Sequence, residues 1–91
     1  MNRLKNGFGQ VSNDVMKNPE LTIRDKGLYA YLCCHADSKT NQLIVSVDRI
    51  ASECNMTRAT VKRILVILEY HDIIFREKRG MGLTSITTIL K

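Results

Sequence analysis

Cysteine and histidine are the residues of this sequence that most readily bind metal ions or act as nucleophiles. Cys33, Cys34 and His35 follow one another directly, and the third cysteine, Cys54, lies well along the chain. Adjacent residues on a helix point about 100° apart, so the two neighbouring thiols do not reach one ion together. We therefore predict structural cysteines in a packed interior, no metal site and no bound cofactor.

No pattern in the sequence assembles the groups that an enzyme needs. Gly80-Met81-Gly82 precedes no helical segment, so it is not a phosphate-binding loop. The sequence also lacks a paired-histidine metal motif and a serine-nucleophile motif. We predict a binding protein rather than an enzyme.

Three basic residues, Arg58, Lys62 and Arg63, are the strongest candidates for function. They lie on a predicted helix, away from its apolar stripe, which consists of Val61, Ile64, Leu65 and Leu68. Arginine and lysine pair with guanine edges and with phosphates in the major groove of a duplex. Small or hydroxyl-bearing neighbours stand beside these basic side chains and help to position them: Thr57, Ala59 and Thr60.

The charge of the chain agrees with an anionic partner. Its 14 basic and 9 acidic residues give a net charge of +5, which favours nucleic acid first and a membrane surface second. The 91 residues provide one small core. No apolar run approaches the roughly 18 to 20 residues of a membrane span, and residues 1–7 lack a secretory signal's apolar stretch. The odd cysteine number indicates a reducing cytoplasm.

Cap residues divide the middle of the chain into three predicted helices. Thr22, with Asp25 three residues on, begins a helix over residues 23–36. Ser46 and Thr57 begin the second and third helices, and the third is expected to end near residues 71–72.

The remaining segments are predicted to be extended or turning. Asn55 is placed to adopt the left-handed conformation that ends a helix. Residues 42–45 are rich in branched side chains and predict a short strand. Residues 8–16 predict a strand or an extended arm.

The C-terminal part is typical of a β-hairpin. Residues 73–79 predict one strand, residues 80–82 its turn, and residues 83–90 the return strand, whose register the alternation leaves open. The first strand and the turn carry the basic flank and a permissive glycine: Arg76, Lys78, Arg79 and Gly80.

The helix over residues 23–36 is apolar on two sides. Leu28 and Leu32 lie on one side, and Tyr29 and Cys33 lie on the other. Because a helix of this kind is usually buried on both sides, we predict a homodimer that pairs through it.

From residue 21 to residue 90 the sequence resembles the winged helix-turn-helix proteins of bacteria, plasmids and phages. The resemblance rests on Ser46-Val47-x-x-Ile50-Ala51, Cys54-Asn55-Met56-Thr57, Thr60-Val61-Lys62-Arg63, Leu68-Glu69 and Ile73-Ile74. Two positions depart from the usual pattern, since Asn55 and Asp72 stand where glycine is common. The resemblance implies an α+β, mostly α fold of three helices and a C-terminal hairpin wing. Residues 1–91 then form one domain, with a flexible arm at 1–7, the helix-turn-helix at 46–70 and the wing at 73–90.

The resemblance also implies a function, which is binding of double-stranded DNA. We expect a small cytoplasmic transcriptional regulator of a bacterial or mobile-element operon, associated with nucleoid or plasmid DNA. Two alternatives stay open: an origin-binding accessory factor in plasmid or phage replication or conjugative transfer, with a protein partner in that complex, and an interaction module that binds an acidic protein. The expected DNA contacts are Thr57, Arg58, Ala59, Thr60, Lys62, Arg63, Arg76, Lys78, Arg79 and Gly80.

Overall fold

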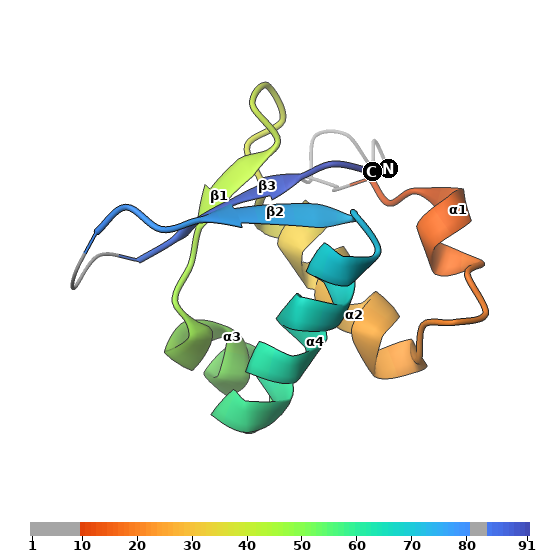
Figure 1. The fold of residues 1–91 in the computed structure, drawn as a ribbon, viewed down its shortest axis with the longest axis horizontal. Coiled ribbons are helices and arrows are strands. Elements are labelled where there is room, and N and C mark those ends of the chain that lie inside the picture. Colours follow the sequence, from red (N-terminus) through yellow and green to blue (C-terminus); the bar gives the residue numbers. More distant parts are fainter. Residues whose placement is uncertain (1–9, 81–83) are drawn as a thin grey trace, which may run out of the picture.

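A computed structural model describes residues 10–80 and 84–91 of the chain. The elements follow in the order α1 (Asn13–Met16), α2 (Ile23–His35), β1 (Gln42–Ile44), α3 (Val47–Cys54), α4 (Arg58–Tyr70), β2 (Ile74–Glu77) and β3 (Ile86–Ile89). A three-stranded sheet lies along one side of α2, α3 and α4, and α1 lies beside α2 at the end remote from the β2–β3 hairpin (Figure 1). This arrangement confirms the predicted α+β, mostly helical winged fold.

Three helices begin at the predicted caps. The Thr22 hydroxyl accepts a hydrogen bond from the Asp25 N–H at 3.2 Å, and the Asp25 carboxylate accepts one from the Thr22 N–H at 2.9 Å. This reciprocal pair satisfies two backbone donors that have no partner inside the helix. The first turns of α3 and α4 are capped by single hydroxyls, Ser46 accepting from Arg49 N–H and Thr57 accepting from Thr60 N–H.

The end of α3 depends on one backbone conformation. Asn55 adopts the left-handed region, with φ 57° and ψ 47°, as the sequence predicts. The Met56 N–H then donates to the Ala51 carbonyl at 2.9 Å. Asparagine tolerates this region better than other non-glycine residues, so the chain reverses between α3 and α4 without a glycine.

The helix α4 also ends at a residue in the left-handed conformation, here an aspartate. Asp72 has φ 56°, its N–H donates to the Glu69 carbonyl, and the Ile73 N–H donates to the Leu68 carbonyl. Both Leu68 and Ile73 are buried, so an apolar contact accompanies this pair of closing hydrogen bonds. The helix therefore ends where predicted, although aspartate occupies the position that usually carries glycine.

The core forms where α2, α3 and α4 meet beneath the sheet. Apolar side chains at helical spacing come from each helix and are joined by the start of β2. At most 2% of each remains exposed in the following set: Leu28, Leu32, Ile50, Val61, Ile64, Leu65, Leu68, Ile73 and Ile74.

The sheet has one strand more than the predicted hairpin. Its order is β1-β3-β2 and both pairings are antiparallel, so β1 adds to the wing's return strand. The wing strands are shorter than predicted, because the ladder covers Ile74–Glu77 and Ile86–Ile89 only. Leu43, Thr87 and Arg76 share one row across the sheet, and the burial of Leu43 and Thr87 shows that this row faces the core.

Part of the N-terminal segment is helical rather than extended. The prediction of a strand or extended arm over residues 8–16 is wrong for its last part, since Asn13–Met16 is the helix α1 and Val15 is buried against the core. The described residues therefore contain four helices rather than three. The expected arm at 1–7 and the hairpin turn at 81–82 lie outside the described residues.

The second apolar side of α2 is covered by the chain itself. Tyr29 is completely buried; its hydroxyl accepts from the Ser12 N–H and donates to the Lys91 carbonyl, both at 2.8 Å. Cys33, on the same side, packs against the core. The ground for predicting a homodimer through this helix was therefore wrong, and the homodimer itself stays a prediction without an assigned surface.

Among residues 10–80 and 84–91, no helix combines the length and the apolar character that crossing a membrane requires.

We predict that Tyr29→Phe destabilises the fold. The change keeps the ring in the core but leaves the Ser12 N–H and the Lys91 carbonyl without their partner. Each of the two lost hydrogen bonds costs about 1 kcal/mol, so the melting temperature of a domain this size should fall by roughly 8–16 °C. Thermal and urea unfolding measure the change, and an unaltered melting temperature would show that the hydroxyl contributes nothing.

The same variant should also differ from the parent chain in how its stability changes at alkaline pH. Burial raises the pKa of Tyr29 from 10.0 to about 12, so the folded chain holds this proton more tightly than the unfolded chain does. The resulting stability is complete below pH 10 and is lost as the pH rises toward 12. Tyr29→Phe should show a smaller alkaline loss than the parent chain. It should keep the part due to Tyr31, whose pKa is also raised to about 12.

We also predict that position 55 distinguishes alanine from glycine. At φ 57° alanine pays the steric cost of the left-handed region, about 1–2 kcal/mol, whereas glycine does not. Asn55→Ala should therefore unfold at lower denaturant concentration, and Asn55→Gly should be close to the parent or more stable. Equal destabilisation by both changes would instead assign the effect to the asparagine side chain.

Candidate nucleic-acid interface

A helix-turn-helix unit forms from α3, residues 55–57 and α4. Ala51 and Val61 are buried at the contact between the two helices, and Met56 packs partly against the core from the turn. The small side chain of Ala51 lets the helices approach closely. This packing fixes the angle at which α4 stands, so its far side faces away from the body of the protein.

The outer side of α4 carries two of the predicted basic contacts in an accessible position. Lys62 and Arg63 are exposed, as is the small neighbour Ala59. Neither cation forms an ion pair with any carboxylate in the part of the chain that the structure describes. The only acidic residue of α4, Glu69, lies near its far end. The first half of α4 therefore contributes cations and no carboxylate of its own to this outer side.

Thr57 and Thr60 act on each other. The Thr57 hydroxyl donates to the Thr60 hydroxyl at 2.9 Å and accepts from the Thr60 N–H at 3.2 Å. Both side chains thereby hold the first turn of α4, which agrees with the positioning role expected of them. Their contact with DNA stays a prediction.

Arg58 is engaged within the protein. Its Nε lies 2.7 Å from Oδ1 of Asp48, in the first turn of α3, and both side chains are more than half exposed. The sequence analysis placed Arg58 on the outer surface of the helix and did not pair it with Asp48. Because the two residues are in the first turns of different helices, no local spacing in the sequence signals their contact.

Arg76 lies on the core-facing side of the wing. Its side chain is 26% exposed and sits in the core-facing row of β2, 3.9 Å from the Glu69 carboxylate. Its Nε is buried without a hydrogen-bond partner among the described residues. Strand alternation explains the placement, because Ile74 is buried and Arg76, two residues on, faces the same side. Arg76 therefore ties the wing to α4.

The other predicted wing residues are exposed beyond the end of β2: Lys78, Arg79 and Gly80. Arg79 Nε donates to the Thr84 carbonyl at 2.7 Å, which joins the two arms of the hairpin. Gly80 has φ 132°, a conformation that side-chain-bearing residues rarely adopt. This end of the hairpin extends past the helices at one end of the molecule (Figure 1).

Two apolar residues on α4 were missed by sequence reasoning. Val66 and Tyr70 are 62% and 82% exposed, and they continue the outer side of the helix beyond Arg63. Their exposure could have been predicted from the sequence, because both positions fall outside the apolar stripe of the helix. An exposed apolar side chain beside cations suits contact with a thymine methyl group in a groove.

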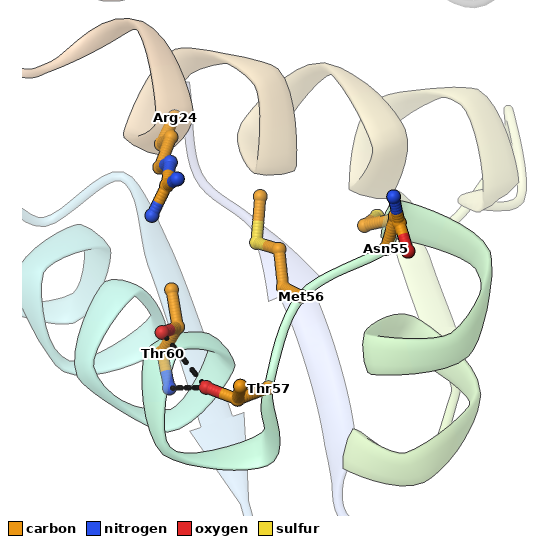
Figure 2. A pocket seen from close by; sticks show the side chains of 6 residues that line it. Arg24, Asn55, Met56, Thr57 and Thr60 are labelled. Atoms are coloured by element: carbon orange, nitrogen blue, oxygen red, sulfur yellow. Dashed lines mark hydrogen bonds between the residues drawn. The ribbon is translucent and has the colours of Figure 1, made fainter.

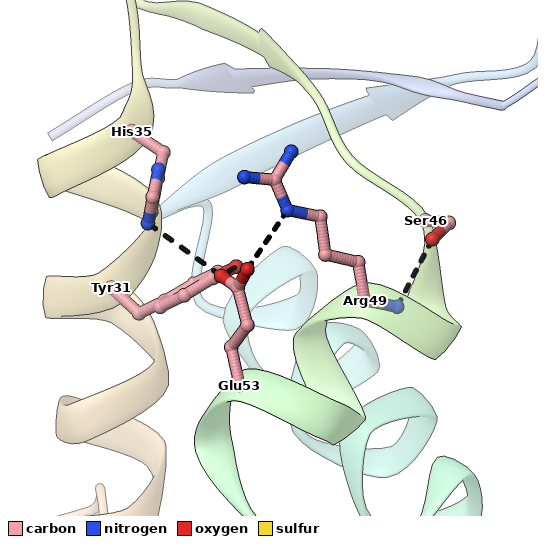
Figure 3. Close-up of polar contacts among 5 residues, drawn as sticks. All are labelled: Tyr31, His35, Ser46, Arg49 and Glu53. Atoms are coloured by element: carbon pink, nitrogen blue, oxygen red, sulfur yellow. Dashed lines mark hydrogen bonds and ion pairs between the residues drawn. The ribbon is translucent and has the colours of Figure 1, made fainter.

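A polar cluster attaches α3 to α2. Glu53 of α3 accepts from the Tyr31 hydroxyl at 2.5 Å and from Arg49 Nε at 3.1 Å, and His35 Nε2 lies 4.0 Å from it (Figure 3). The hydrogen bonds from Tyr31 and Arg49 lower the pKa of Glu53, so the carboxylate stays charged. The cluster binds the supporting helix to the scaffold on the side away from α4.

A pocket of about 380 Å³ lies at the turn, where α2 faces the start of α4. Figure 2 shows Arg24 of α2 pointing toward Thr60, with Met56 beside them. Arg24 thus adds a positive charge near the start of α4. No local pattern predicts this placement, because Arg24 belongs to a helix far from α4 in the chain.

The cysteines show no sign of a shared site. Burial raises the pKa of Cys33 and of Cys54, which keeps both thiols protonated near neutral pH. Cys34 is exposed on α2, so the prediction that the cysteines lie in a packed interior is wrong for this residue. Within the described ranges, no three His, Cys, Asp or Glu side chains come together as metal ligands would.

Comparisons with known proteins agree with this geometry. A family model described as a helix-turn-helix domain matches residues 20–74. No curated protein sequence matches the chain significantly. The solved structure titled "N-Terminal domain of DNA binding protein" is 20% identical with a TM-score of 0.74, and "Structure of Rep-DNA complex" is 20% identical with a TM-score of 0.71. Each match covers 98% of this chain and 78% of the other.

The solved structures establish the fold, and the family match spans α2, α3, α4 and the start of β2, which together contain the turn and the outer side of α4. The chain belongs to the helix-turn-helix domain family.

Proposed function

We propose that this protein binds double-stranded DNA, with α4 in the major groove and the wing against the flanking backbone. One observation carries the proposal: Lys62 and Arg63 stand on the outer side of a helix that α3 props away from the body, with no carboxylate paired to either among the described residues. A helix supported in this way suits groove entry. Membership of the helix-turn-helix family supports the same conclusion.

The dimensions of α4 fit the proposed groove. Its 13 residues extend about 20 Å, and a helix with its side chains is about 10–12 Å across. The major groove of B-form DNA is about 12 Å wide. Lys62 and Arg63 would then reach base edges or phosphates. Ala59 and Val66 would lie close to the bases, and their side chains have no polar group that needs a hydrogen-bond partner.

The wing supplies a second proposed contact. Lys78, Arg79 and Gly80 form its exposed end, where positive charge and a small residue allow close approach to a phosphate or a narrow minor groove. Arg76 reaches DNA only if its ion pair with Glu69 exchanges, so we assign it mainly to holding the wing on α4.

The proposed mechanism is binding rather than catalysis. We propose as its role a small transcriptional regulator of a bacterial or mobile-element operon, acting by occupancy of its site as a homodimer.

We predict that Lys62→Ala combined with Arg63→Ala reduces affinity for duplex DNA by roughly 100-fold while the fold survives, since each lost base or phosphate contact costs about 1–3 kcal/mol. Fluorescence anisotropy with a labelled duplex measures the loss. Lys17→Ala combined with Lys39→Ala removes the same charge from two exposed sites remote from α4. This control should bind almost as the parent does.

The salt dependence of the parent chain tests the same surface. If each chain neutralises about four phosphates, log affinity should fall with log salt at a slope of about −3.6. The double variant on α4 should have a shallower slope than the control pair. A parent chain whose affinity does not respond to salt would be incompatible with DNA binding.

A second role has one observation in its favour. The fold resembles that of a protein solved in a Rep–DNA complex, which supports an origin-binding accessory factor in plasmid or phage replication or transfer. This role keeps the same surface on α4 and changes the arrangement of sites on the DNA.

Selection from a random-core duplex pool distinguishes the roles, and we expect the regulator to enrich an inverted repeat, because a symmetric dimer reads two symmetric half-sites. A direct repeat or single half-site would favour the accessory factor. Retention without enrichment would indicate backbone binding only. Absence of retention at low salt would favour a module that binds an acidic protein.

A further inference from the structure

The contact between Asp48 and Arg58 sits on the surface proposed to face DNA. Asp48 is in the first turn of α3, Arg58 is the first residue of α4, and their atoms Oδ1 and Nε are 2.7 Å apart. Both side chains are largely exposed, at 72% and 62%. Of the three cations predicted for α4, Arg58 alone is paired with a carboxylate of the described chain.

A carboxylate at this place opposes contact with phosphates. An exposed ion pair is held weakly, so Arg58 can leave it for another partner. A phosphate that approaches Arg58 must also approach the negative charge of Asp48, and the repulsion reduces the gain. Sequence-independent binding, which depends on phosphate contacts, is therefore weakened by Asp48.

The edge of a guanine base meets no such opposition. Its O6 and N7 atoms are uncharged acceptors, and arginine pairs with them through two parallel hydrogen bonds. The guanidinium has five N–H donors in a fixed plane. With Nε beside Asp48, the two terminal nitrogens remain for the guanine, so Arg58 need not leave the carboxylate to read this base.

We propose that Asp48 determines specificity by positioning Arg58 for the edge of a guanine and disfavouring its transfer to phosphate. The inference rests on the proposed DNA binding and deepens it. Asp48 then lowers the affinity for random DNA and raises the ratio between the preferred site and random DNA. Specificity here arises partly from a group that repels the wrong partner.

Asp48→Asn tests the proposal, because asparagine keeps the shape and removes the charge. Affinities are measured for the selected duplex, for the same duplex with 7-deazaguanine at the read position, and for a random duplex. In the parent chain, 7-deazaguanine should weaken binding about tenfold through loss of one acceptor. In Asp48→Asn, affinity for random DNA should rise several-fold, and the salt slope should steepen by about 0.9 as one phosphate contact is gained.

The specificity ratio is the deciding readout. Asp48→Asn should reduce the preference for the selected duplex over random DNA by about tenfold, the discrimination of a single arginine–guanine pair. In a background of Arg58→Ala, the same change should leave this ratio and the 7-deazaguanine effect unaltered. That dependence on Arg58 separates positioning from general repulsion by Asp48.

Asp14→Asn is the matched charge control, since Asp14 is exposed in the first turn of α1, remote from α3 and the start of α4 (Figure 1). It should change neither the ratio nor the slope measurably. An equal gain in affinity for both duplexes in Asp48→Asn, or an undiminished ratio, would overturn the proposal while leaving DNA binding intact. Failure of the parent chain to bind any duplex at low salt would overturn the proposed function as well.

Discussion

The angle between α3 and α4 is the constraint on which the rest of the structure depends. It is set by the left-handed conformation of Asn55 and by the close approach of the two helices at Ala51 and Val61. If that turn opened, the apolar stripe of α4 would leave the core and its basic side would no longer project. The burial that stabilises the fold and the presentation of the cations are therefore consequences of one geometry.

Two polar systems fix the helices of this unit, one joining α3 to α2 and the other joining α3 to α4, and they work differently. On the side that faces α2, the Glu53 carboxylate accepts hydrogen bonds from Tyr31 and Arg49 and lies near His35. These hydrogen bonds keep the carboxylate ionised. On the exposed side, Asp48 faces Arg58 without further partners among the described residues. The first system fixes the position of α3. The second, an exposed ion pair, is weak enough to rearrange when a ligand binds at α4.

Features that depend on neighbouring residues could be predicted from the sequence. The caps at Thr22, Ser46 and Thr57 and the left-handed Asn55 were all predicted, because a cap needs only its own residue and the first turn. The apolar stripe of α4 followed from periodicity, and so did the exposure of Lys62 and Arg63.

Features that depend on distant partners were not predictable in this way. The helix α1 has only four residues, which is too short for a repeating apolar pattern, and it is held in place by the burial of Val15. The sequence therefore does not predict it. The side of the wing on which Arg76 lies depends on the strand register, which the imperfect alternation of the return strand left open. The pairing of Asp48 with Arg58 depends on how two helices cross.

The distribution of the carboxylates divides the cations into two groups. Arg58 and Arg76 each lie beside a carboxylate of another element, whereas Lys62 and Arg63 have none among the described residues. A phosphate would meet no competition at the second group and competition at the first. Affinity should therefore come mainly from Lys62 and Arg63. Discrimination should come mainly from Arg58, whose terminal nitrogens stay available to a guanine edge while its Nε remains beside Asp48. An ion pair at the surface is weak, so it adds little to the stability of the fold. Its proposed effect is to disfavour contacts of the paired cation with phosphate.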